Sequence, residues 1–474
     1  MSACVRRGGE TMEPVILDST NEQSPPVGLR EALLRGQAPD RGLYWPRRFP
    51  PLSPEEIAAF AGLPYWRIAW EVLRRYMGGV LDAEALETVC REAYDFDVPL
   101  EPVCNRIYVM RLDRGPSASF KDFAARWMAR VIGRFVREEG GELTILTATS
   151  GDTGSAVASA FHDVPGIRVI VLFPVGEVSE RQRRQMTTLR GNIRAVAVGG
   201  KFDDCQAMVK RAFSDPVLGA IPLTSANSIN IGRLLPQSVY YFYAASRVAE
   251  CGEPVVFAVP SGNFGDMMGA VVARAMGLAL KRLVAPVNGN DAFPRFLATG
   301  SYEKIEPSRA CLSNAMNVGH PSNLARLVAA YGGRMDEAGA IHRRPDLDRM
   351  RGDLYSTSVS DAQTREAIRA AWERHRLLLE PHGAVGWRGL EDYLAVEPLG
   401  GSPAVVIETA HPAKFPDEIV ALLGFAPEAP AALAALDQCR EDYDRLGVDY
   451  ESFRDYLLER HSAGSAGRQS STLS

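Results

Sequence analysis

The stretch LTILTATSGDTGSAVASAF at residues 143–161 sets the fold class, because it joins a short apolar run to a helical segment through a turn of small polar residues. Residues 143–147 are apolar and β-branched, which is typical of a strand buried on both faces. Residues 153–161 follow the helical period. A buried strand that leads directly into a helix predicts an α/β fold with parallel strands.

The same alternation continues along most of the chain. We expect further strands at residues 168–173, 193–198, 255–259, 282–286 and 405–408, and helices at residues 123–138, 202–214 and 230–248. The first hundred residues differ, since prolines separate short helical patches and no strand alternation is visible. This predicts a mostly helical N-terminal unit. The Ser- and Gly-rich end from His461 onward predicts a disordered tail.

Length, charge and cysteine usage narrow the class of protein. A chain of 474 residues exceeds one compact core, so two or three packed units are expected. The net charge of −5, with acids and bases interspersed, argues against a nucleic-acid or membrane-surface partner and favours a small molecule. Seven scattered cysteines without a C-x-x-C pair indicate a reducing cytoplasm, and no metal site or membrane-spanning segment is predicted.

A lysine stands where a turn of small residues enters a helix. The stretch GPSASFKDF at residues 115–123 places Lys121 at this junction. An amine held by a helix start can be aimed into a cleft, as a lysine that forms a Schiff base requires. The alternative is an ordinary solvated lysine in the first turn of a helix.

Two other turns between a strand and a helix are suited to anions. The first contains Ser150, Gly151, Asp152 and Thr153, whose backbone N–H groups and hydroxyls form a cup that suits a substrate carboxylate. The alternative is a plain helix cap.

The second anion-binding turn is PSGNFGD at residues 260–266. Gly262 and Gly265 allow close approach of a phosphate to the backbone, and the helix start adds partial positive charge. The turn lacks the lysine of a Walker loop and the spacing of a dinucleotide fingerprint. The Asp266 carboxylate would repel a phosphate unless it caps the helix or faces away.

A fourth polar segment, ETAHPAKFP at residues 408–416, follows the last predicted strand. The hydroxyl of Thr409 can hydrogen-bond a pyridine nitrogen without forcing a proton onto it. His411 and Lys414 are candidates for an acid and a base, but a histidine at a strand end is more often a structural donor. We therefore expect these two residues to contact the residues of the site and not the ligand.

In this order the four segments resemble the threonine synthase family, which belongs to the pyridoxal-phosphate (PLP) enzymes of fold type II, the tryptophan synthase β family. The resemblance extends from about Asp18 to Gly424. It implies two open, mostly parallel α/β domains with a mostly helical N-terminal unit. The implied boundaries are 1–98 for the N-terminal unit, 99–140 and 226–440 for a large PLP-binding domain, 141–225 for an inserted small domain, and 441–474 for a C-terminal helix and disordered tail.

The resemblance also implies a reaction and a set of site residues. The reaction is conversion of O-phospho-L-homoserine and water to L-threonine and phosphate, in a monomer or homodimer. Lys121 would carry PLP as a Schiff base, and Thr409 would meet its pyridine nitrogen. The implied contacts are Gly262, Asn263, Phe264, Gly265 and Asp266 for the cofactor phosphate, Ser150, Gly151, Asp152 and Thr153 for the substrate carboxylate, and Asn227, Ser228 and Arg233 for the substrate phosphate.

The sequence departs from the family pattern at Asp113-Arg114, where Arg114 replaces a histidine. A guanidinium suits a phosphate, a phosphonate or a carboxylate, so one hypothesis is a related substrate of specialised metabolism that contacts Arg114. The alternative is a surface ion pair between Asp113 and Arg114. Two other readings are a phospho-lyase that releases a 2-oxo acid and a catalytically silent binding protein on the same scaffold.

Overall fold

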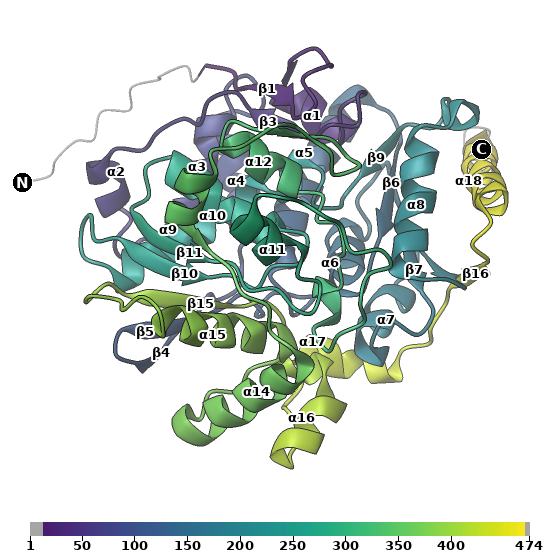
Figure 1. Ribbon diagram of the computed structural model, residues 1–474. Helices are drawn as coiled ribbons and strands as arrows, with labels where there is room; N and C mark the ends of the chain where they lie inside the picture. The colour runs from purple at the N-terminus through teal and green to yellow at the C-terminus, as the bar shows by residue number, and fades with distance from the viewer. Residues whose placement is uncertain (1–12, 470–474) are drawn as a thin grey trace, which may run out of the picture.

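The computed structural model describes residues 13–469, with side chains described up to residue 461, and contains two open β-sheets beside each other (Figure 1). The larger sheet has the order β14-β11-β10-β15-β5-β4, and its neighbouring strands are parallel except for β4 and β5. Its strands are β4 (Leu100–Cys104), β5 (Ile107–Arg111), β10 (Val255–Ala258), β11 (Leu280–Val284), β14 (Leu354–Tyr355) and β15 (Ala404–Glu408).

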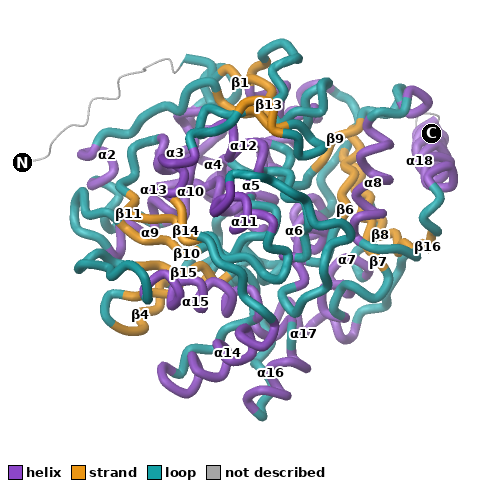
Figure 2. Tube along the Cα trace, viewed as in Figure 1, coloured by secondary structure: helices purple, strands orange, loops and turns teal. Residues whose placement is uncertain are grey.

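The smaller sheet is entirely parallel and has the order β16-β8-β7-β6-β9. Its strands are β6 (Leu143–Ala148), β7 (Ile167–Pro174), β8 (Ile193–Val198), β9 (Leu223–Ser225) and β16 (Asp444–Leu446). The two groups of strands are separate in Figure 2. The predicted α/β class with two open, mostly parallel sheets is confirmed.

Both faces of the larger sheet are apolar, which explains why its strands read as continuous apolar runs. Alternate residues enter different cores: Val255 and Phe257 pack in one core, whereas Val256 and Ala258 pack in the other. The first core includes α9 (Val239–Val248) and α10 (Gly265–Ala275), and the second includes α14 (Asp361–His375) and α15 (Pro381–Leu394).

The remaining helices surround the two sheets. Those nearest the smaller sheet are α5 (Lys121–Glu139), α6 (Asp152–Phe161), α7 (Glu180–Thr187), α8 (Phe202–Phe213) and α18 (Tyr450–Gln469). Short helices complete the larger unit: α11 (Ala292–Thr299), α12 (Leu324–Ala330), α13 (Leu347–Asp353), α16 (Pro416–Leu423) and α17 (Ala431–Ala434). A small antiparallel pair, β12 (Arg334–Met335) and β13 (Ile341–Arg343), lies near the N-terminal unit.

The N-terminal unit is mostly helical, but it also contains strands that the sequence did not predict. Its helices are α1 (Leu29–Arg35), α2 (Pro54–Ala58), α3 (Tyr65–Leu73) and α4 (Ala83–Ala93). An antiparallel sheet joins β1 (Ile16–Ser19), β2 (Val27–Gly28) and β3 (Tyr44–Pro46). Strands of two to four residues are too short to show an alternating pattern.

The C-terminal region differs from expectation in two ways. β16 adds a strand to the smaller sheet, and α18 continues to Gln469 where a disordered tail was predicted from His461. Phe453 and Leu457 are buried together with Met208 and Val209, so packing against α8 holds this helix. Residues 470–474 lie outside the described part of the chain. The predicted domain boundaries stay a prediction.

The helix predicted at residues 230–248 is also interrupted. Two 3-10 turns, Ile231–Arg233 and Leu235–Ser238, precede α9. Pro236 lies in the second turn, where its ring and missing N–H prevent a regular α-helix.

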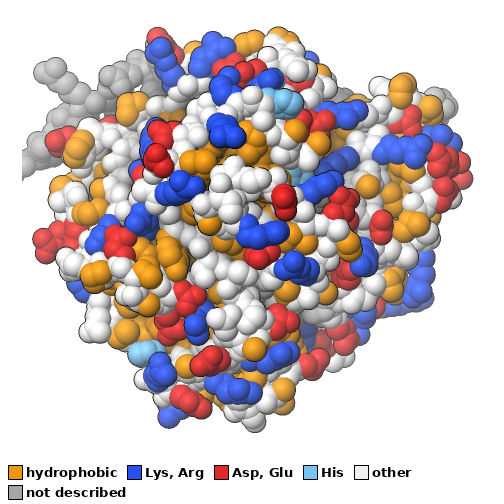
Figure 3. Space-filling model, viewed as in Figure 1, with side chains coloured by type: hydrophobic (Ala, Val, Ile, Leu, Met, Phe, Trp, Pro, Cys, Tyr) orange, Lys and Arg blue, Asp and Glu red, His pale blue; other side chains and the backbone are white. Residues whose placement is uncertain are grey.

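Surface properties bear on the possible partners. On the face drawn in Figure 3, Lys and Arg are interspersed with Asp and Glu. No helix in residues 13–469 is both long and apolar enough to cross a bilayer.

Candidate active site

A cavity between the two sheets collects nearly all of the predicted site residues. It lies beyond the carboxyl ends of β5, β6, β10 and β15, where open parallel sheets usually bind ligands. Of the predicted residues, those that line it are Lys121, Ser150, Asp152, Thr153, Asn227, Ser228, Arg233, Gly262, Asn263, Phe264, Gly265, Asp266 and Thr409.

Lys121 is the first residue of α5 and is half-buried in this cavity. Its Nζ lies 4.3 Å from the centroid of the Phe120 ring. Burial lowers the pKa of Lys121 to about 8. The negative charge of Asp152 raises this pKa, whereas the positive charges of Lys414 and Arg233 lower it further. The uncharged amine, which a nucleophile or proton carrier requires, is therefore far more populated near neutral pH than in an ordinary lysine.

The turn before Lys121 is fixed on two sides. The Ser117 N–H donates to Asp122 Oδ2 over 2.8 Å, and Ala118 has a left-handed φ of 54°. The Phe120 N–H donates to the Thr409 carbonyl over 2.9 Å, and the His411 N–H donates to the Ala118 carbonyl over 3.0 Å. This short antiparallel contact sets Thr409 beside Lys121.

The predicted phosphate turn packs tightly and ends in a helix start. A Cβ atom at Gly262 would lie 2.7 Å from the Met316 Cα, so only glycine fits there. Phe264 has a left-handed φ of 61° immediately before α10. Asn263 Nδ2 donates to Ser228 Oγ over 2.6 Å, which ties this turn to residues 227 and 228.

The Asp266 carboxylate faces two tyrosines. Tyr241 donates to Asp266 Oδ1 over 2.6 Å, and Tyr240 donates to the same oxygen. Burial raises the pKa of Asp266 to about 6. The tyrosine hydroxyls thus hold this carboxylate, and the repulsion that it would exert on an anion is reduced.

Glu380 and His382, a carboxylate and an imidazole beside Thr409, were not predicted as site residues. Thr409 Oγ1 donates to Glu380 Oε1 over 3.4 Å, and Glu380 Oε2 lies 2.6 Å from His382 Nδ1. His382 Nε2 accepts from the Ala315 N–H over 3.0 Å. Because Nε2 accepts, Nδ1 carries the proton that bonds Glu380. The sequence signal was Glu380 before Pro381, which is typical of a helix start.

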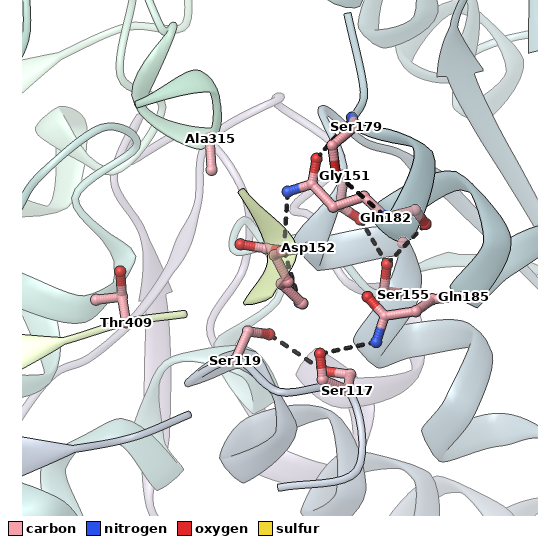
Figure 4. A network of polar contacts seen from close by, with 12 residues as sticks. Ser117, Ser119, Gly151, Asp152, Ser155, Ser179, Gln182, Gln185, Ala315 and Thr409 are labelled. Carbon is pink, nitrogen blue, oxygen red and sulfur yellow. Dashed lines mark hydrogen bonds and ion pairs between the residues drawn. The ribbon is translucent and has the colours of Figure 1, made fainter. Parts of the chain in front are cut away.

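The predicted carboxylate cup lies at the start of α6, and Figure 4 shows its polar surroundings. Thr149 Oγ1 accepts from the N–H groups of Gly151 and Gly154 over 2.9 and 2.8 Å, which fixes the turn. The Asp152 carboxylate accepts from Lys414 Nζ over 2.8 Å. This side chain is therefore occupied, and only the backbone and hydroxyls of the cup are available to a ligand.

Arg233 is a buried cation in the cavity wall. Its Nη1 donates to the Ala226 carbonyl, but its side chain forms no ion pair with a carboxylate within residues 13–461, and its Nε is buried without a hydrogen-bond partner. Burial lowers the pKa of Arg233 to about 10. An unpaired buried guanidinium that lines a cavity is suited to an anionic group of a ligand. Asn227 and Ser228 line the same wall.

Arg114 does not line the cavity. Its guanidinium lies 3.7 Å from Asp113 Oδ1 and 4.0 Å from Glu101 Oε1, and its side chain is exposed. The expectation that Arg114 contacts the substrate stays a prediction, and the observed position of Arg114 favours the alternative of an ion pair with Asp113. Gly151 turns at the edge of the cavity with a φ of 135°, without lining it.

Three family models match successive parts of the chain. "Threonine synthase N terminus" matches residues 17–94, "Pyridoxal-phosphate dependent enzyme" matches residues 98–409, and "Threonine synthase, C-terminal" matches residues 383–457.

Curated proteins and solved structures agree with these matches. The chain is 39% identical to the threonine synthase of Haemophilus influenzae, over 91% of this chain and 97% of that protein. It is 38% identical to the threonine synthase of Escherichia coli, over 93% and 98%. The PLP-bound threonine synthase from Brucella melitensis superimposes with a TM-score of 0.86 at 35% identity, covering 94% of this chain and 98% of that one. Threonine synthase from yeast gives a TM-score of 0.85 at 27% identity, over 95% and 99%.

Proposed function

The chain belongs to the threonine synthase family of PLP-dependent enzymes, and on that basis we propose that it converts O-phospho-L-homoserine and water into L-threonine and phosphate. One observation carries this proposal. A single cavity contains the Lys121 amine, a glycine turn at a helix start, the Thr409 hydroxyl and the unpaired cation of Arg233. These are the groups needed by a phosphorylated cofactor and by a phosphorylated substrate.

The residues present fit PLP. The close contact at Gly262 and the start of α10 provide backbone N–H groups for the cofactor phosphate, with Asn263, Phe264, Gly265 and the Asp266 backbone. Lys121 provides the amine for the aldehyde, and Thr409 provides a hydroxyl for the pyridine nitrogen. When bound, PLP withdraws electrons from the α carbon of an amino acid.

The same wall provides separate places for the two anionic ends of the substrate. We assign the α-carboxylate to the cup at residues 150–153 and the phosphate to Asn227, Ser228 and Arg233. Arg233 supports this assignment because its guanidinium is buried in the cavity wall without a carboxylate partner in the described residues. Two fixed anion sites orient the carbon chain between them.

Lys121 is the group we assign to proton transfer. Its lowered pKa of about 8 lets the amine both accept and return a proton near neutral pH. These groups line one cavity between the two sheets, and closure of this cavity would limit access of water to the reacting carbons. Water is nevertheless a reactant, so a closing movement that admits it in a controlled way is expected.

The proposal of a related substrate depended on Arg114, and Arg114 lies outside the cavity lining. Conversion of phosphohomoserine is therefore the reaction that the site supports best. The chain's location in the cytoplasm and its state as a monomer or homodimer remain proposals, and sedimentation of the purified protein determines the second.

Incubation of purified protein with O-phospho-L-homoserine tests the reaction. We expect stoichiometric release of phosphate and L-threonine. Phosphate together with 2-oxobutanoate and ammonia would identify a phospho-lyase instead. No release of phosphate by a protein that binds PLP would reject both enzymatic readings.

A further inference from the structure

The cup assigned to the substrate carboxylate contains a carboxylate of its own. Asp152 is the first residue of α6 and is 3% exposed. The first backbone N–H groups of a helix have no acceptor within the helix and attract anions. An uncompensated charge on Asp152 would compete with a bound carboxylate for this attraction.

Lys414 compensates this charge from the other domain. It ends the 3-10 helix Pro412–Lys414 after β15, is 0% exposed, and donates to Asp152 Oδ1 over 2.8 Å. Asp152 is its only ion-pair partner among residues 13–461. Burial alone would raise the pKa of Asp152, but Lys414 and Lys121 keep it well below its ordinary value, so this carboxylate is charged at neutral pH.

A second set of contacts fixes the Asp152 carboxylate from α7 and from the loop above it. Gln182 Nε2 donates to Asp152 Oδ1 over 3.0 Å, and Asn314 Nδ2 donates to Gln182 Oε1 over 3.0 Å. Figure 4 shows the Gln182 side chain extended toward Asp152. The same oxygen of Asp152 is thus held from both domains.

Burial of an ion pair is a weak way to gain stability, because both charges lose their hydration. A role in the site explains its position better. We propose that Lys414 is a positioning residue for the substrate carboxylate. Its charge cancels that of Asp152 and holds the Asp152 side chain, so that the start of α6 can receive the carboxylate of the substrate. This proposal rests on the proposed function.

The test compares ligands with and without an α-carboxylate. In Lys414→Met, we expect the KM for O-phospho-L-homoserine to rise at least about tenfold, because the buried Asp152 carboxylate then loses its only ion-pair partner among residues 13–461 and repels the ligand carboxylate more strongly. The inhibition constant of 3-aminopropyl phosphate, which lacks only the carboxylate, should change by less than about twofold. A parallel loss for both ligands, or an unchanged KM, would overturn the proposal.

A second variant separates charge from structure. Lys414→Met combined with Asp152→Asn removes both charges, leaves no unpaired buried ion, and should recover most of the lost affinity. If the double variant retains cofactor absorbance but binds phosphohomoserine as weakly as the single variant, charge compensation is wrong.

A ligand that does not need turnover distinguishes this proposal from the reaction itself. The absorbance of the bound cofactor reports the dissociation constants of L-threonine and of 1-aminopropan-2-ol, which lacks the carboxylate. If the native enzyme fails to convert phosphohomoserine, the proposed function fails. Lys414 is still tested, since Lys414→Met should weaken only L-threonine.

Discussion

The backbone N–H of Phe120 donates a hydrogen bond of 2.9 Å to the carbonyl oxygen of Thr409, although the two residues are far apart along the chain. This contact puts the amine of Lys121 and the hydroxyl of Thr409 on the same wall of one cavity. The pairing of these two backbone segments therefore brings both groups to one site.

Replacement of Lys121 removes the only group that we assign to both cofactor attachment and proton transfer. In Lys121→Ala, we expect loss of the yellow colour and a fall in kcat of at least about a thousandfold. Borohydride treatment of the native protein, followed by peptide mass analysis, should locate the reduced cofactor on Lys121. Attachment at another lysine would contradict the assignment.

Replacement of Arg233 should weaken binding of the substrate phosphate. Since a hydrogen bond to a charged group contributes more than a neutral one, we expect Arg233→Met to raise the KM for phosphohomoserine about tenfold to a hundredfold. Inhibition by inorganic phosphate should weaken in proportion. Arg114→Met is the matched control, because Arg114 lies outside the cavity lining. Equal effects in the two variants would refute a phosphate site at Arg233.

Replacement of Thr409 should change the absorbance and reactivity of the bound cofactor more than it changes attachment of the cofactor to the protein. In Thr409→Val the shape is kept but the hydroxyl is lost, so we expect retention of colour, a shifted absorbance maximum, and a fall in kcat of up to about tenfold. Thr147→Val is a suitable control, since the Thr147 hydroxyl is also buried but has no hydrogen-bond partner among the described residues. A spectrum identical to that of the native enzyme would argue against contact between Thr409 and the cofactor ring.

We expect the folded protein to lose stability in mild acid because of His411. Burial, with the nearby charges of Arg114 and Arg111, lowers its pKa from 6.5 to about 4. Between these two values the unfolded chain binds a proton that the folded chain does not. The contribution of His411 to stability is therefore complete above pH 6.5 and is lost as the pH falls toward 4.

Thermal unfolding at several pH values measures this effect. In the native protein, His411 Nδ1 accepts a hydrogen bond of 3.1 Å from the Ala413 N–H. His411→Asn keeps an acceptor for this N–H group and should make the melting temperature less dependent on pH in this window. His375→Asn, which replaces an exposed histidine, is the control for the substitution itself. A steeper dependence in His411→Asn would show that the sign of the shift is wrong.

Local pattern was sufficient for the strands at the centre of each sheet. The strand predicted at residues 193–198 is observed with the same limits, and that predicted at residues 143–147 is one residue short. Such strands are buried on both faces, so they appear in the sequence as continuous apolar runs that are long enough to be recognised. The other strands were missed. Most of them, such as β9, β14 and β16, have only two or three residues and show no period, but β4 and β5 have five residues each and were also not predicted.

The sequence by itself determined the α/β class and the position of the candidate lysine at the start of a helix, because each depends on residues that are neighbours along the chain. Tertiary structure decided which polar side chains face the ligand. It paired Asp152 with Lys414, directed Asp266 toward two tyrosines, and left Arg114 outside the cavity. Those outcomes depend on side chains from distant segments competing for the same buried charges, and spacing along one segment contains no information about that competition.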